Sequence, residues 1–225
     1  MPKEVQHTTG HRARLRESFL LRKLTDQELL ELLLTYAIPR VDVKPIAFAL
    51  LKKFGGIHHV FAAPINLLST VRGVGHNTAV FIKAVQSVML TDLKNALDAA
   101  PVFREYKNLE DYCRLMLAGA QTEEFHVMYL NSDFRLIVDD LHSSGTIDWA
   151  AVYPREIIKR ALDLNAAALI LLHNHPAASN AFSSDDIRIT NDIRGMLEMV
   201  GIELLDHLLV AGGIVYSAKN MFLLK

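Results

Sequence analysis

Two histidines and an aspartate stand at a spacing that can hold one metal ion. His173 and His175 are two residues apart, and Asp186 follows three positions after Ser183. In an extended strand, residues i and i+2 point to the same side, so both imidazole rings can turn toward one ion. Three protein ligands without an evident fourth are typical of a catalytic zinc site, which keeps one position open. The spacing therefore predicts Zn²⁺ bound by His173, His175 and Asp186.

The segments around these residues predict a strand and a helix that present them. Residues 166–172 form a continuous apolar run of strand length, and Pro176 ends it because proline lacks the N–H that a sheet needs. Ser183 and Asp186 match a capping box, which predicts a helix with Asp186 in its first turn. Taken singly, the histidines fit a polar loop and the serine a plain helix cap. Their combination favours a metal site.

Other metal-dependent enzyme classes do not fit the sequence. A zinc deaminase needs a Pro-Cys-x-x-Cys pair, and Cys113 is the only cysteine. The His-Glu-x-x-His motif of thermolysin-like proteases is absent. The adjacent letters His-Asn-His at 173–175 do not reproduce the nuclease site of that name, whose residues come from separate elements.

The motif resembles a known metal site. His173-x-His175, seven residues that begin with Pro176, and then Ser183-x-x-Asp186 are similar to the metal motif of the JAB/MPN (JAMM) metalloprotease superfamily. The surrounding chain, over roughly residues 10–225, resembles the bacterial RadC family. The segments that carry this likeness are Arg14–Arg16, Asp26–Leu30, Gly73–Gly75, Tyr153–Glu156, Ala167–Leu171 and Leu205–Leu208. The resemblance implies a zinc-dependent hydrolase of peptide or isopeptide bonds.

The resemblance also implies two catalytic residues. The family's Glu-x-Phe pattern falls on Glu123-Glu124-Phe125, so Glu123 is expected to take a proton from the attacking water. Glu124 points to the opposite side of a strand, so only one of the two can face the metal. Ser183 is expected to steady the oxyanion, and His207 either orients the site or forms a hydrogen bond in the core.

The sequence departs from the family pattern at one loop. Family members usually carry Ser-Gly after the His-x-His-Pro and a proline before the motif serine, where this chain has Ala177-Ala178 and Phe182. Alanine adopts a positive φ less readily than glycine. The departure bears on the conformation of the loop and on substrate fit, while the metal ligands are intact.

Composition predicts a cytoplasmic protein. The 225 residues, 51% hydrophobic and 22% charged, are enough to bury a sizeable core. One cysteine excludes a disulfide framework. No apolar run approaches the ~20 residues needed to cross a bilayer, and the polar start through Arg16 lacks a signal-peptide core. We therefore expect no membrane partner, and the sequence indicates no oligomeric state.

Charge and pattern divide the chain near Pro101. Residues 1–100 contain 13 Lys and Arg against 8 Asp and Glu, a net charge of +5, whereas residues 101–225 have a net charge of −6. Proline there ends a helical pattern. We predict a helical domain over 1–100 and an α/β metal-binding domain over 101–225, with a mixed sheet flanked by helices as in JAB/MPN proteins.

The first half has helical periodicity throughout. Helices are expected from Thr25 or Asp26, across Ile46–Leu50, from Pro64 to Val71, and from Asn77 or Thr78 past Leu97. The glycine-rich segment 72–76 between the last two resembles a helix-hairpin-helix turn. Its glycines would let backbone N–H groups approach a DNA phosphate without reading bases. The same segment fits a plain connector, so residues 72–83, which include Arg72 and Lys83, are a candidate site for non-specific DNA.

The second half alternates strand and helix patterns. Strands are expected at Phe125–Leu130, Arg135–Val138, 166–172, Leu205–Val210 and Ile214–Ser217, and helices at Pro154–Leu164 and after Ser184. Gly212-Gly213 is expected to turn the last two strands into a hairpin.

Three functions fit these features. The leading interpretation is a zinc metallopeptidase-like hydrolase acting on a protein or peptide substrate. In the first alternative, the metal centre hydrolyses a DNA or nucleotide phosphodiester. The helix-hairpin-helix pattern favours that reading, although many nucleases use two metals. In the second alternative, the chain is a non-catalytic DNA- or protein-binding module with a structural zinc. The presence of Glu123 argues against it, because a structural site needs no water-activating carboxylate.

Overall fold

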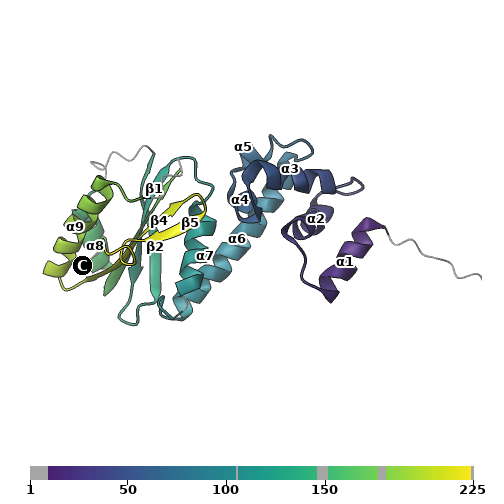
Figure 1. Ribbon diagram of the computed structural model, residues 1–225. Helices are drawn as coiled ribbons and strands as arrows, with labels where there is room; N and C mark the ends of the chain where they lie inside the picture. Colours follow the sequence, from purple (N-terminus) through teal and green to yellow (C-terminus); the bar gives the residue numbers. More distant parts are fainter. Residues whose placement is uncertain (1–9, 105, 146–151, 177–180, 224–225) are drawn as a thin grey trace, which may run out of the picture. The chain divides into compact units, whose positions relative to one another are not determined.

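The computed structural model describes residues 10–104, 106–145, 152–176 and 181–223 (Figure 1). The chain forms two compact units, Met1–Ala84 and Val85–Lys225. The division lies within helix α6 (His76–Ala99), whereas the proline criterion placed it near residue 100, where that helix ends. The physical reason is that Leu97, near the end of α6, packs into the core of the second unit.

The first unit is helical, as its periodicity predicts. Its helices are α1 (His11–Leu21), α2 (Asp26–Ala37), α3 (Lys44–Phe54), α4 (Ile57–Ala62), α5 (Ile65–Leu68) and the first part of α6. Thr25 caps α2 in a capping box with Glu28, which resolves the choice between Thr25 and Asp26. Leu30, Leu34 and Leu50 are fully buried between these helices.

The segment before α6 differs from the prediction. The helix expected from Pro64 to Val71 is only the four-residue α5, and α4 was not predicted. The chain turns after α5 through Gly73, whose φ of 92° lies in the left-handed region that favours glycine. A Cβ at Gly73 would stand 2.7 Å from Ile46 Cδ1, so the tight turn also favours a residue without a side chain.

The second unit is a five-stranded mixed sheet with helices on both faces, which confirms the predicted fold class (Figure 1). After α6 come α7 (Tyr106–Leu117), β1 (Glu123–Leu130), β2 (Leu136–Gly145), α8 (Pro154–Asp163), β3 (Ala168–His175), α9 (Ser184–Met199), β4 (Glu203–Ala211) and β5 (Ile214–Ser217). The strand order is β2-β1-β3-β4-β5, in which β3 and β4 are parallel and the other neighbours antiparallel. This order places β3 in the centre.

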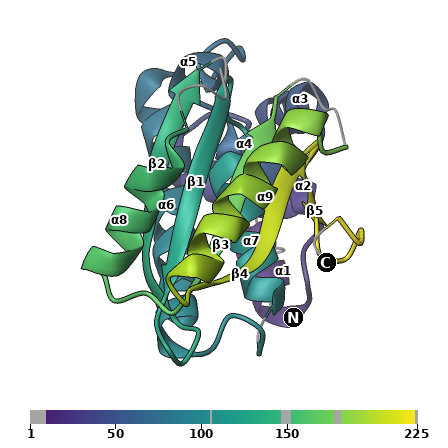
Figure 2. The same ribbon diagram turned by 90° about the vertical axis from the view of Figure 1, so that its left-hand side faces the viewer.

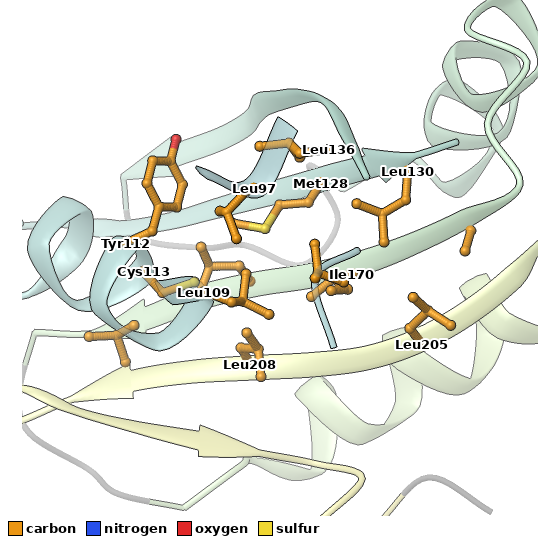
Figure 3. Packing of buried hydrophobic residues seen from close by; sticks show 14 of the residues in the cluster. Leu97, Leu109, Tyr112, Cys113, Met128, Leu130, Leu136, Ile170, Leu205 and Leu208 are labelled. Atoms are coloured by element: carbon orange, nitrogen blue, oxygen red, sulfur yellow. The ribbon is translucent and has the colours of Figure 1, made fainter. Parts of the chain in front are cut away.

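Each face of the sheet has its own hydrophobic core. Helices α8 and α9 cover one face (Figure 2), where Phe125, Val127 and Leu171 pack against Ile157 and Ile193. Helix α7 and Leu97 of α6 cover the other, where the residues labelled in Figure 3 gather around Met128, Ile170 and Leu208. Because successive side chains of a strand alternate between faces, the two cores interleave along β1 and β3.

Most local expectations for the second unit hold, but α7 was not predicted and several strands have other bounds than expected. Gly212 and Gly213 have φ of 56° and 77° and join β4 to β5, as the type I′ hairpin requires. β1 begins two residues earlier than predicted, and β2 runs to Gly145 because it pairs with β1 along its whole length. In the described parts of the chain, no helix has the length and apolar character to cross a membrane.

Candidate metal centre

The central strand β3 presents both histidines at its carboxyl end. His173 is fully buried, and the side chain of His175 keeps 12% of its exposure. His173 pairs with Phe125 of β1. Directly opposed residues of an antiparallel pair share a face, so the histidines lie on the face that α8 and α9 cover.

Helix α9 brings the aspartate to the same place. Ser183 is the N-cap: its Oγ accepts the Asp186 N–H at 3.1 Å, and Asp186 Oδ2 accepts the Ser183 N–H at 2.6 Å. The predicted capping box therefore exists, and it fixes the carboxylate in the first turn. Only Oδ2 takes part in the cap, so Oδ1 is turned toward the histidines.

The three side chains gather around one point. His173 Nε2 lies 3.1 Å from His175 Nε2 and 3.3 Å from Asp186 Oδ1, and His175 Nε2 lies 3.5 Å from Asp186 Oδ2. These side chains form a group whose ligand atoms all lie within 4.8 Å of one another. The structure thus brings together the three residues that the sequence selected.

A chain of hydrogen bonds behind His173 determines which of its nitrogens faces this point. The Thr190 hydroxyl donates to the carbonyl of Asp186, so at its 2.6 Å contact with His207 Nδ1 it must accept. His207 then carries its proton on Nδ1, and its Nε2 accepts from His173 Nδ1 at 2.8 Å. A neutral His173 protonated on Nδ1 has its lone pair on Nε2, directed at Asp186.

The donor set fits a cation. Asp186 Oδ1 is the one buried side-chain atom in the described residues that has no hydrogen-bond partner. A buried oxygen of this kind is costly unless something positive approaches it. It faces the lone pair of His173 at 3.3 Å, and two electron-rich atoms at that distance repel each other. A metal ion that accepts imidazole nitrogen and carboxylate oxygen would satisfy both atoms at once.

The electrostatics of the site keep the ligands in their metal-binding forms. Burial lowers the pKa of His173, and the Asp186 and Glu123 carboxylates oppose this shift only in part. Burial also lowers the pKa of His207 well below its ordinary value. Burial by itself would raise the pKa of Asp186, but a proton that His173 or His175 directs at the carboxylate, together with the Ser183 N–H, brings it well below its usual range. At neutral pH the centre therefore has a neutral His173 imidazole and an ionised Asp186 carboxylate.

The sheet register places Glu123 and Glu124 on opposite faces. Glu123 is two residues from Phe125, which pairs with His173, so alternation places it on the side of the metal ligands. Glu124 Oε2 instead lies 3.4 Å from His126 Nε2, and His126 Nδ1 lies 3.0 Å from Asp139. That group belongs to the face covered by α7. Of the two glutamates, Glu123 is therefore the one on the same face as the candidate ligands.

Phe182, which replaces the family's usual proline, packs against the centre. Its ring lies edge-on to His173 and His207, with centroids 5.7 Å and 5.2 Å away. The Ala177-Ala178 pair lies outside the described residues. Thr190 is a contributor that sequence reasoning missed, because a threonine inside a helix has no spacing that marks it.

The contact between His207 Nε2 and His173 Nδ1 favours the first of the two roles open to His207 from the sequence, that of orienting the site. Replacing His207 with leucine removes the acceptor for His173 Nδ1 and is expected to lower the affinity for a metal ion about 10- to 100-fold. Competition with a chelating indicator measures the change. His126→Leu, which removes another buried histidine but on the α7 face, is the matched control and should keep wild-type affinity. Equal losses in both variants would show a general packing effect.

Comparison with known proteins agrees with this site. A family model described as RadC-like JAB domain matches residues 103–223, a span that contains the whole sheet and all three ligands. The chain belongs to the RadC-like JAB domain family. A UPF0758 protein of Ruegeria pomeroyi is 41% identical over 212 residues, covering 93% of this chain and 95% of that protein. A UPF0758 protein of Rhodobacter capsulatus is 43% identical over 202 residues, covering 88% and 94%. The resemblance drawn from the sequence is thereby confirmed, and the metal centre lies inside the RadC-like JAB domain.

Proposed function

We propose that this protein is a zinc-dependent hydrolase that cleaves peptide or isopeptide bonds in a protein or peptide substrate. The observation that carries the proposal is the convergence of His173, His175 and Asp186, whose ligand atoms all lie within 4.8 Å of one another. The cluster in the described residues offers three ligands, which suits a catalytic zinc with a position open to water and substrate. A structural zinc would instead be closed by a fourth ligand.

Each residue of the centre has a task in this proposal. A zinc ion held by the three ligands supplies Lewis-acid chemistry: it lowers the pKa of water from about 15.7 to about 7 and polarises a carbonyl. Glu123 accepts a proton from the attacking water and passes it to the leaving amine. The Ser183 hydroxyl donates to the oxygen that becomes negative during attack. His207 keeps His173 in the tautomer that directs Nε2 to the metal.

The ligand set supports amide over phosphodiester hydrolysis. Many enzymes that hydrolyse phosphodiesters use two metals about 3.5–4 Å apart, which clamp the attacking and leaving oxygens. The described residues provide one cluster of three ligands, and Glu123 beside it suits water activation more than a second metal. Phosphodiester hydrolysis remains the alternative that the test below separates.

The test is to incubate the zinc-loaded protein with a proteome-derived peptide library and, in parallel, with labelled DNA. We expect cleaved peptides and intact DNA. Zinc-loaded Glu123→Gln protein, prepared in the same way, controls for contaminating proteases and should leave the library uncut. Cleaved DNA beside an intact library would replace the peptidase proposal with the phosphodiesterase alternative.

We further propose that the first unit binds duplex DNA non-specifically near residues 72–83. The supporting observation is the difference between the two turn glycines. A Cβ at Gly73 would collide with Ile46, whereas a Cβ at Gly75 meets nothing within 4 Å, so that backbone is open to a phosphate. Lys83 should contribute less to DNA binding than its sequence position implies, because its Nζ donates to the carbonyls of Phe61 and Ala62 at 3.2 Å.

DNA affinity of the full chain should be weak, independent of sequence and reduced by salt. Arg72→Ala is expected to lower the slope of log affinity against log salt by about 1, since it removes one phosphate contact. Gly75→Val should weaken binding by blocking backbone approach. Fluorescence anisotropy measures both, and Lys159→Ala, an exposed lysine of α8, is the control. If no binding occurs at low salt, the turn is a helix connector and the first unit is better explained as a protein-docking module.

A further inference from the structure

We propose that Asn174 is a positioning residue that holds Glu123 against the metal ligands. The inference deepens the proposed hydrolase, because it concerns the residue that takes the proton. Asn174 lies between the two histidine ligands in the sequence, and its side chain cannot share their face of β3. It has no place in the ligand set. Its contacts instead reach across to the beginning of β1.

The Asn174 amide bonds to the backbone on both sides of Glu123. Its Oδ1 accepts the N–H of Glu124 at 2.8 Å, and its Nδ2 donates to the carbonyl of Thr122 at 3.0 Å. Asn174 is 2% exposed, so both bonds are shielded from water on its side. The residue held between these two bonds is Glu123.

The backbone pairing of β1 with β3 explains why this clamp matters. The ladder between the strands ends at the pair Phe125 and His173, two residues short of Glu123. Beyond that pair, the Asn174 side chain supplies the hydrogen bonds to β1 that the backbone of β3 does not. Thr122 is exposed, and β2 pairs with the other edge of β1 as far as Glu123, so Asn174 restrains this end of β1 from the β3 side.

The clamp connects the proton acceptor to the most rigid part of the sheet. Asn174 pairs through its backbone with Val210 of β4, and its neighbours are the metal ligands themselves. Beyond the last backbone pair of β1 with β3, the direct link between Glu123 and the ligand strand is therefore one short side chain. A misplacement of about 1 Å can reduce catalysis by about 100-fold, so such a restraint has a catalytic consequence.

Only an amide suits this position. Asparagine offers one acceptor and two donors on a short stem, so it can serve an N–H and a carbonyl together. Aspartate would lack the donor for Thr122, and leucine would lack both groups.

The test compares Asn174→Ala and Asn174→Ser with Glu123→Gln in the cobalt-loaded protein. The visible absorption of cobalt changes with pH as a proton leaves the open position of the site. Glu123→Gln is expected to move the midpoint of that change by about one pH unit, because a carboxylate beside it becomes a neutral amide. Each Asn174 variant should move it in the same direction by about half a unit.

A double-mutant cycle separates positioning from general stability. Added to Glu123→Gln, Asn174→Ala should move the midpoint by less than about 0.2 unit, since its effect acts through Glu123. Asn131→Ala is the matched control: Asn131 Oδ1 accepts the N–H groups of Asp133 and Arg135 at the far end of β1. Asn131→Ala should lower the stability of the protein without moving the midpoint of the cobalt absorption change. A full shift from Asn174→Ala in the Glu123→Gln background, or none in either background, would overturn the proposal.

Amide hydrogen exchange distinguishes failure of the clamp from failure of the proposed hydrolase. The Glu124 amide should exchange about ten times faster in Asn174→Ala, because its acceptor is gone and its carboxyl-side neighbours still hold the ladder. Unchanged exchange would show that the clamp does not hold β1. The other outcome is that Glu123→Gln leaves the midpoint unmoved while the Glu124 amide still exchanges faster in Asn174→Ala. Glu123 would then be rejected as the proton acceptor, and the Asn174 clamp would be kept.

Discussion

Replacing Asp186 with asparagine is expected to remove zinc binding and, without zinc, to stabilise the protein. The wild type should hold about one zinc per chain, and the variant should bind it more than about 100-fold less tightly. Loss of a metal ligand should lower zinc affinity at least as much as loss of a residue that hydrogen-bonds a ligand. In the absence of zinc, the amide can donate to His173 Nε2 where the buried Oδ1 has no partner. Relieving a buried unsatisfied oxygen is worth about 1–3 kcal/mol.

Metal analysis and thermal unfolding with and without a chelator measure this reversal. With zinc present, the wild type should unfold at the higher temperature, and with chelator the order should invert. Asp186→Ala is the matched control: it also removes the ligand, but it loses the acceptor for the Ser183 N–H and so about 1 kcal/mol of helix capping. Full zinc occupancy in Asp186→Asn would exclude Asp186 from the ligand set.

Glu123→Gln is expected to keep both the fold and the zinc and to lose hydrolysis by about 100- to 10,000-fold. Glutamine has the shape of glutamate but cannot accept the proton of the attacking water at neutral pH. Zinc content and circular dichroism check that the site remains intact. Turnover of a peptide found in the library screen then isolates the chemical step.

Glu124→Gln is the control for this second prediction. Glu124 stands one residue away and contacts His126 on the opposite face, so its replacement should leave turnover within about tenfold of wild type. Loss of activity in Glu124→Gln with an active Glu123→Gln would mean that the strand register is wrong by one residue.

The sequence by itself determined the features that depend only on residues close together along the chain. Strand periodicity places His173 and His175 on one side because every second residue of a strand faces the same way. The capping box at Ser183 predicts the position of Asp186 because a cap spans only three residues. The helices of the first unit and the glycine turn before β5 follow from the same kind of local rule. Where α5 stops was not predictable from local pattern, and the turn at Gly73 that follows it lies against Ile46 of a different helix.

Only the tertiary structure decided the contacts that make these residues one site. The order β1-β3-β4 brings His207 to within 2.8 Å of His173, 34 residues away in sequence, and Asn174 to within 3.0 Å of Thr122, 52 residues away. No periodicity encodes such distances, because they depend on which strands pair and in which register. The same register separates Glu123 from Glu124. The residue types of the site could be identified from the sequence. Its contacts could not, because they exist only once the strands lie side by side: these are the tautomer of His173, the unpartnered Asp186 Oδ1 and the Asn174 clamp.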